Sequence, residues 1–242
     1  GTRSVARHFL FRADRASAVE APSDATPVTT IADDGAEVHA IELAPPPGAR
    51  VVVHFHNNSE TMSGPLAMAR AIHARGLGVL LVEYRGYGVS GGTPDEEGLY
   101  RDASAALDWL ASRGVGPDRV VLSGTSLGTG VAAEMARRGR GAALVLISPY
   151  TSIPDLVLDR APFVPARLLV PDHFETLAKA SAIRVPTLVI HGDADDVVPF
   201  WMGQRVASAI PGARLIRVAG GRHGDGDLFE RDAERAADIA RL

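Results

Sequence analysis

The sequence predicts a single α/β domain with an eight-stranded, mostly parallel sheet and helices on both of its faces. Six short apolar runs alternate with helically spaced segments, which is typical of parallel strands that are buried on both faces. Two further strand-like segments precede these runs and are joined by a tight-turn sequence. Of the 242 residues, 46% are hydrophobic and 22% are charged, which supplies a buried core and excludes a disordered chain.

The order of the elements follows from the spacing of the apolar residues. Residues 28–31 and 37–43 are expected to form an antiparallel hairpin around Asp33-Asp34-Gly35. The six parallel strands are expected at residues 51–53, 79–82, 120–122, 144–147, 187–190 and 215–218. Helices are expected near residues 66–73, 99–110 and 200–210, after Ser126, and over about the last 16 residues.

The domain organisation is expected to be simple. Residues 1–26 are interpreted as an N-terminal extension, and residues 27–242 as a single domain. Residues 149–183 are rich in proline and longer than an ordinary connection, so we expect a short cap-like excursion there. Its apolar residues could line an acyl groove or pack in the core, and we favour the core; they are Phe163, Leu168, Leu169 and Val170.

Composition excludes several classes of function. The net charge of −4 and the absence of a Lys/Arg-rich block argue against nucleic-acid binding. The absence of cysteine excludes disulfides, thiolate metal sites and a cysteine nucleophile. No apolar run approaches the roughly 18 residues of a membrane helix. We therefore expect a chain that is soluble as given, cytoplasmic or anchored only through a segment absent from this sequence, while its compartment and oligomeric state are not readable.

The most informative segment runs from Val120 to Gly130 and has the order strand, Gly-x-Ser-x-Gly, helix. Such a turn exposes a serine hydroxyl at a strained apex above the sheet. Gly124 and Gly128 flank the apex because side chains there would collide as strand and helix approach. The motif is weak by itself in a chain with 25 glycines, but its place between a strand and a helix makes Ser126 the predicted nucleophile.

A serine nucleophile needs a base that a carboxylate orients. On a sheet of this kind the expected chain order is serine, acid, histidine, each at the end of a strand. Asp195 lies in the loop after the strand at 187–190 and is the predicted acid, while Asp193 and Asp196 are expected to shape the loop or be solvated. His223 lies among glycines after the last strand and is the predicted base.

An acyl-transfer site also needs two N–H groups that bind the oxyanion. The backbone N–H of Leu127 is the first predicted donor, because it follows the nucleophile. The second is expected in the loop after the strand at 51–53, with Asn58 preferred and Asn57 the alternate, although both asparagines could simply shape this loop. His54 and His56 are spaced like metal ligands, but no third ligand is placed by the sequence, so no metal site is predicted.

On these motifs the chain resembles small, minimally capped serine hydrolases of the α/β-hydrolase fold. It is similar to those related to protein depalmitoylases and to the catalytic domains of prolyl-oligopeptidase-like peptidases. The resemblance runs from about Val28 to the C-terminus and is carried by residues 54–58, 83–91, 124–128, 191–199 and 221–223. It implies the same catalytic serine, acid and base, and a structural role for the segment around Ser90. Where the family usually has His-Gly, this chain has His56-Asn57, and asparagine tolerates positive φ better than most residues.

The predicted activity is hydrolysis of carboxylic esters or thioesters through a Ser-His-Asp triad and an acyl-enzyme. The substrate is expected to be a small or acylated molecule, and no nucleotide, metal or other cofactor is called for. One alternative is a peptidase or acyltransferase with the same triad. Another is a non-catalytic binding protein on a hydrolase fold, since a fold does not imply a function.

Overall fold

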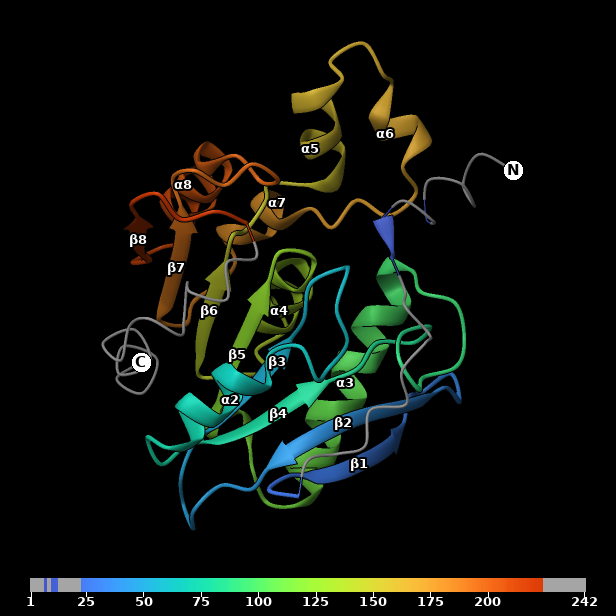
Figure 1. The fold of residues 1–242 in the computed structure, drawn as a ribbon, viewed down its shortest axis with the longest axis vertical. Helices are drawn as coiled ribbons and strands as arrows, with labels where there is room; N and C mark the ends of the chain where they lie inside the picture. The colour runs from blue at the N-terminus through green and yellow to red at the C-terminus, as the bar shows by residue number, and fades with distance from the viewer. Residues whose placement is uncertain (1–6, 8–9, 13–22, 224–242) are drawn as a thin grey trace.

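The computed structural model describes residue 7, residues 10–12 and residues 23–223 of the chain. An eight-stranded sheet in the order β1-β2-β4-β3-β5-β6-β7-β8 forms its centre (Figure 1). The six strands from β3 to β8 run parallel, and β2 pairs antiparallel with both β1 and β4. The strands are β1 Thr26–Ile31, β2 Glu37–Leu43, β3 Val51–Phe55, β4 Gly78–Val82, β5 Val120–Thr125, β6 Ala143–Ile147, β7 Thr187–Gly192 and β8 Arg214–Val218.

The predicted fold class is confirmed, but several strands end later than predicted. Strand β3 continues through His54 to Phe55, and β5 continues through Ser123 to Thr125, so a polar residue does not by itself end a strand. These two polar side chains lie side by side on neighbouring strands, where His54 Nδ1 and Ser123 Oγ are 3.0 Å apart. Because each side chain gives the other a hydrogen-bond partner, both can stay buried inside the sheet.

Helices connect the strands and cover the sheet. They are α2 Leu66–His73, α3 Glu96–Ser112, α4 Leu127–Arg137, α5 Ile153–Arg160, α6 Ala166–Leu169, α7 Thr176–Ala180 and α8 Phe200–Ala209, with a 3₁₀ turn at Pro117–Arg119. The helix expected in the last 16 residues or so lies outside the described residues. Within the described part of the chain, no helix has both the length and the apolar character needed to cross a membrane.

Two apolar layers form the core, one on each face of the sheet. Successive side chains of a strand point to opposite faces. Val51 and Val53 of β3 accordingly join the layer that packs under α3, α4 and α8, and Val52 joins the layer that packs under α2. Because both faces are covered, the central strands consist almost entirely of apolar residues, which explains the continuous runs in the sequence.

The excursion between β6 and β7 carries α5, α6 and α7. In Figure 1, α5 and α6 lie together at the end of the molecule opposite β1 and β2. Phe163 and Leu168 are 98% and 83% exposed, so the interpretation of these residues as core packing is wrong. Leu169 is 39% exposed, and only Val170 of the four packs against the core.

Candidate active site

Ser126 stands at the turn between β5 and α4. Its backbone has φ 50° and ψ −115°, a conformation that is rare for a residue with a side chain. The flanking glycines make this turn sterically feasible. A Cβ on Gly124 would collide with the backbone of Gly128, and a Cβ on Gly128 would collide with the carbonyl oxygen of Phe55. The glycine spacing of the motif is therefore required by contacts between β3, β5 and α4.

The structure brings Ser126, Asp195 and His223 together from three strand ends. His223 Nε2 lies 3.1 Å from Ser126 Oγ, and His223 Nδ1 lies 2.9 Å from Asp195 Oδ2. A carboxylate can only accept, so Nδ1 carries the hydrogen and Nε2 is left free to accept the serine proton. This is the arrangement of a general base beside a nucleophile, with a third group orienting the base.

The carboxylate of Asp195 is buried and fully engaged. Its Oδ1 accepts the N–H groups of Val197 and Val198, at 2.9 and 2.8 Å. Burial raises the pKa of Asp195, but hydrogen bonds from His191 and His223 outweigh it and hold that pKa well below its ordinary value. Asp195 therefore stays negatively charged, as it must to stabilise an imidazolium beside it.

His191 is a site neighbour that the sequence interpretation missed. It is fully buried, and its Nε2 lies 2.9 Å from the carbonyl oxygen of Val198 and 3.3 Å from Asp195 Oδ2. Since a carbonyl only accepts, Nε2 carries a hydrogen that faces both oxygens. Its position four residues before Asp195 was the available signal. The contact arises because the loop after β7 folds back over the end of its own strand.

The loop after β3, residues 56–60, is predicted to bind the oxyanion and is called the oxyanion loop below. Its hydrogen bonds distinguish the two predicted asparagine donors. The N–H of Asn57 donates to Glu60 Oε1 at 3.3 Å. For the N–H of Asn58 we find no acceptor in the part of the chain that the structure describes. The Nδ1–H of His56 donates to the carbonyl of Asn57 at 2.7 Å. In a planar trans peptide the C=O and the N–H point in opposite directions, so the N–H of Asn58 points away from His56. Among non-glycine described residues, positive φ occurs at Ser126, Ser148 and Phe174, so neither asparagine uses it.

The segment after β4, residues 83–87, supports this loop through hydrogen bonds. Glu83 Oε1 lies 2.9 Å from His56 Nε2, the hydroxyl of Tyr84 donates to the carbonyl of His56 at 3.0 Å, and that of Tyr87 donates to the carbonyl of Asn58 at 3.2 Å. Burial raises the pKa of both tyrosines, so they remain donors at neutral pH. The resemblance gave this segment a structural role, and its contacts are of that kind.

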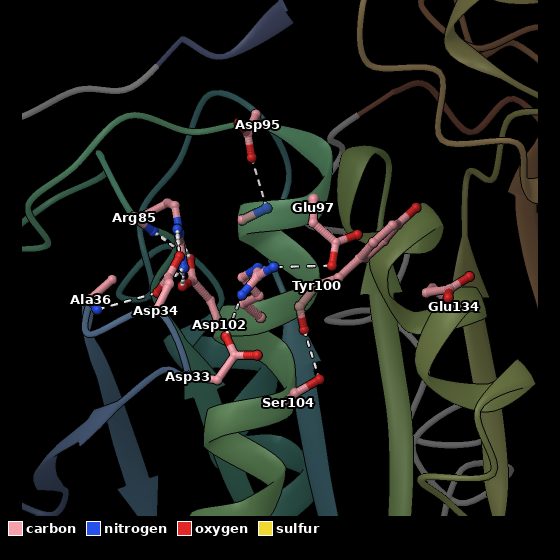
Figure 2. A network of polar contacts seen from close by, with 12 residues as sticks. Asp33, Asp34, Ala36, Arg85, Asp95, Glu97, Tyr100, Asp102, Ser104 and Glu134 are labelled. Carbon is pink, nitrogen blue, oxygen red and sulfur yellow. Dashed lines mark hydrogen bonds and ion pairs between the residues drawn. The ribbon is translucent and has the colours of Figure 1, made fainter.

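The same segment is tied to α3 by a buried ion pair, which Figure 2 shows beside that helix. Arg85 donates to Asp102 through its backbone N–H and its guanidinium, each at 2.8 Å, and reaches Asp34 at 2.6 Å. The side chain of Asp102 is fully buried, while that of Arg85 is 11% exposed. The support of the oxyanion loop is therefore fixed to the scaffold of the domain.

Other polar residues that the sequence singled out have different surroundings. Asp193 accepts from Arg217 and from the N–H of Gly220, which shapes the loop before His223. Ser90 is buried, and its hydroxyl has no hydrogen-bond partner within the described residues, so nothing there would activate it. His54 and His56 bond to different partners, and no group of three or more potential ligands is found among residues 7, 10–12 and 23–223.

Comparison with known proteins places the chain in a family. Residues 46–172 match the family model described as serine aminopeptidase, S33. The chain belongs to this family of α/β-hydrolases. The match begins before β3 and ends beyond α6, so it contains the oxyanion loop and the nucleophile turn but neither Asp195 nor His223.

Several relatives resemble this S33-family hydrolase. It is 40% identical over 181 residues to the uncharacterized protein Rv2307c of Mycobacterium tuberculosis, a match that covers 74% of this chain and 64% of that protein. It is 34% identical over 198 residues to alpha/beta hydrolase domain-containing protein 17C of Xenopus tropicalis, covering 78% of this chain and 61% of the relative. The chain thus spans somewhat less than two thirds of these relatives' length.

A solved structure supports the fold independently. The esterase Pf2001 of Pyrococcus furiosus superposes with a TM-score of 0.77 over 95% of this chain and 96% of its own, at 17% identity. At that identity the likeness concerns the fold. It supports the assignment of the eight-stranded, mostly parallel sheet to the α/β-hydrolase fold.

Proposed function

We propose that this S33-family hydrolase cleaves carboxylic esters or thioesters through a covalent acyl-enzyme on Ser126. The observation that carries the proposal is the continuous chain from Ser126 Oγ through the ring of His223 to the buried Asp195 carboxylate, with distances of 3.1 and 2.9 Å. A scaffold protein has no need of a strained serine aligned with a histidine whose tautomer is set for accepting a proton.

The mechanism follows from the donors and acceptors in place. His223 Nε2 takes the hydroxyl proton as Ser126 Oγ bonds to the acyl carbon, and the carbonyl π electrons move to its oxygen. Two backbone N–H groups stabilise that oxyanion. That of Leu127 is at the first position of α4, where a helix has no internal acceptor for it, and that of Asn58 has no acceptor among the described residues. The carbonyl re-forms, the bond to the leaving group breaks, and His223 gives its proton to the leaving alkoxide or thiolate.

Deacylation repeats the same steps with water. His223 removes a proton from water as the water oxygen attacks the acyl carbon of the acyl-enzyme. It then returns a proton to Ser126 Oγ when the acid is released. Charge on Asp195 is retained throughout, because the low pKa of this carboxyl keeps it from taking the proton. The proposed substrates are small acyl esters or acyl groups that a larger partner presents.

The family description names an aminopeptidase, but one feature favours ester or thioester cleavage. An aminopeptidase must bind the protonated amine of its substrate, usually with a carboxylate. Around the site, Glu60 accepts from the oxyanion loop, Glu83 pairs with His56, and Asp193 pairs with Arg217. Among the described residues, these three carboxylates are therefore already engaged by the protein itself, and Asp196 of the same loop as Asp195 is exposed to solvent.

The test is turnover of p-nitrophenyl esters from acetate to palmitate by the wild-type chain and by Ser126→Ala. We expect the variant to lose about 10⁴-fold or more in kcat, as for removal of a triad nucleophile. A matching acyl-thioester series can be followed with a thiol reagent, because the chain has no cysteine and so no background. Equal low rates for both proteins, together with no labelling of Ser126 by a fluorophosphonate, would reject the proposal.

A further inference from the structure

Two N-terminal residues, Leu10 and Arg12, contact Asn58 of the oxyanion loop, although 48 and 46 positions separate them from it in the sequence. The side-chain Nδ2 of Asn58 donates to the carbonyl of Leu10 at 3.0 Å, and the backbone N–H of Arg12 donates to the carbonyl of Asn58 at 3.1 Å. We call Arg7, Leu10, Phe11 and Arg12 the N-terminal latch. It was expected to belong to an extension outside the domain.

The latch is held in place by two anchors of its own. Phe11 is 4% exposed and contacts the ring of Phe174 edge-on, with centroids 6.4 Å apart, so it belongs to the core layer under α3 and α4. Arg7 binds the buried carboxylate of Asp172 with two hydrogen bonds, of 2.7 and 3.1 Å. The latch therefore connects the cap excursion, at Asp172 and Phe174, to the oxyanion loop.

These contacts act on the residue that supplies the second oxyanion donor. Three groups fix the frame of Asn58: Tyr87 and Arg12 hold its carbonyl, and Leu10 holds its side chain. With its carbonyl and its Cβ direction both constrained, the residue has little freedom to turn its own N–H. Oxyanion donors must be oriented before the reaction if they are to stabilise developing charge.

We propose that the N-terminal latch is a positioning element of the active site, and that turnover depends on its docking against Asn58. The proposal rests on the proposed function, because it assumes that the N–H of Asn58 binds an oxyanion. Ground-state substrate binding does not use this donor to the same extent, so loss of the latch lowers kcat and leaves KM nearly unchanged.

The first test removes a single hydrogen-bond donor. Arg12→Pro deletes the backbone N–H that holds the carbonyl of Asn58, whereas Arg12→Ala removes the same side chain and keeps that N–H. We expect kcat on a p-nitrophenyl ester to be lower in the proline variant than in the alanine variant by about 10-fold or more. Complete loss of an oxyanion donor, about 10²–10³-fold in kcat, sets the upper limit.

The second test removes the anchor and separates positioning from stability. Phe11→Ala should lower kcat, and Phe11→Leu should restore most of it by refilling the buried site. Val38→Ala, in the same core layer but on β2, should lower the melting temperature similarly and leave kcat unchanged. Trifluoromethyl ketone inhibitors form a tetrahedral oxyanion on Ser126, so their affinity should fall in parallel with kcat for the latch variants only.

The outcomes distinguish this inference from the proposed function. If Ser126→Ala abolishes turnover while Arg12→Pro and Phe11→Ala keep the wild-type kcat and inhibitor affinity, the latch has no positioning role and only this inference fails. If Ser126→Ala is as active as wild type, the proposed function itself fails. Equal losses of kcat in Phe11→Ala and Val38→Ala would also overturn the inference, because general destabilisation would then explain the effect.

Discussion

Replacement of Asp195 by asparagine tests the proposed triad, because it exchanges a single carboxylate oxygen for an NH₂ group. In the native site Oδ1 accepts two backbone N–H groups, and Oδ2 faces His223 Nδ1 at 2.9 Å and His191 Nε2 at 3.3 Å. The amide oxygen of an asparagine must take the Oδ1 position, since the two N–H groups still need an acceptor. Its NH₂ group then faces His223.

The consequence for His223 is a reversed tautomer. A donor opposite Nδ1 forces that nitrogen to accept, so the hydrogen moves to Nε2 and points at Ser126 Oγ, 3.1 Å away. The histidine can then no longer take the serine proton. We expect kcat to fall about 10⁴-fold, equivalent to about 5.5 kcal/mol of transition-state stabilisation at about 1.4 kcal/mol for each tenfold change.

The assay is steady-state hydrolysis of p-nitrophenyl acetate, with the melting temperature as a check on folding. Asp196→Asn is the matched control, because it removes one charge from an exposed residue of the same loop and should change kcat by less than about 3-fold. A folded Asp195→Asn protein within tenfold of the wild-type kcat would refute the assignment of Asp195 as the acid that orients His223.

Three further predictions concern the scaffold of the site. Gly128→Ala places a Cβ against the carbonyl of Phe55. It should cost about 1–3 kcal/mol of stability by overpacking, measured by thermal melts. It should also lower kcat about 10²-fold by displacing the nucleophile turn, measured by ester turnover. Arg85→Met leaves the buried carboxylate of Asp102 without its guanidinium and should lower the free energy of unfolding by about 3–5 kcal/mol, seen as a lower urea midpoint. Burial lowers the pKa of His54 to about 3, below its unfolded value of about 6.5, so the unfolded state binds this proton first as pH falls. Stability is therefore lost between about pH 6.5 and pH 3, by up to about 4–5 kcal/mol, and His54→Gln should show a shallower decline in urea unfolding across that range.

Much of the candidate site was predictable because its residues come with local signals. Gly124 and Gly128 mark the nucleophile turn by their spacing, and Asp195 and His223 follow apolar strands directly. Parallel strands bring their carboxyl ends to one edge, so residues far apart in the chain could be assigned to one place. The structure brings Ser126, Asp195 and His223 within hydrogen-bond distance, while their catalytic roles stay a prediction until the variants are measured.

The partners that surround these residues had no such signal. Nothing local to Glu83 indicates a pairing with His56 across 27 positions, and nothing local to Arg12 indicates a hydrogen bond to Asn58. The interpretation of Phe163 as core failed for a related reason. An apolar residue in an irregular segment has no periodicity, and without periodicity its burial cannot be assigned.

By itself, then, the amino-acid sequence determined the fold class, the order of the elements and the positions from which the nucleophile, acid and base would come. Periodicity and glycine spacing report the local backbone and the face that it buries, and these properties are encoded over a few neighbouring residues. Only the tertiary structure decided which asparagine N–H has no acceptor among the described residues, which groups hold that asparagine in place, and that Leu10 and Arg12 contact it. Those contacts depend on how separate elements meet in space, because a hydrogen bond between distant residues forms only after the whole sheet has placed them together.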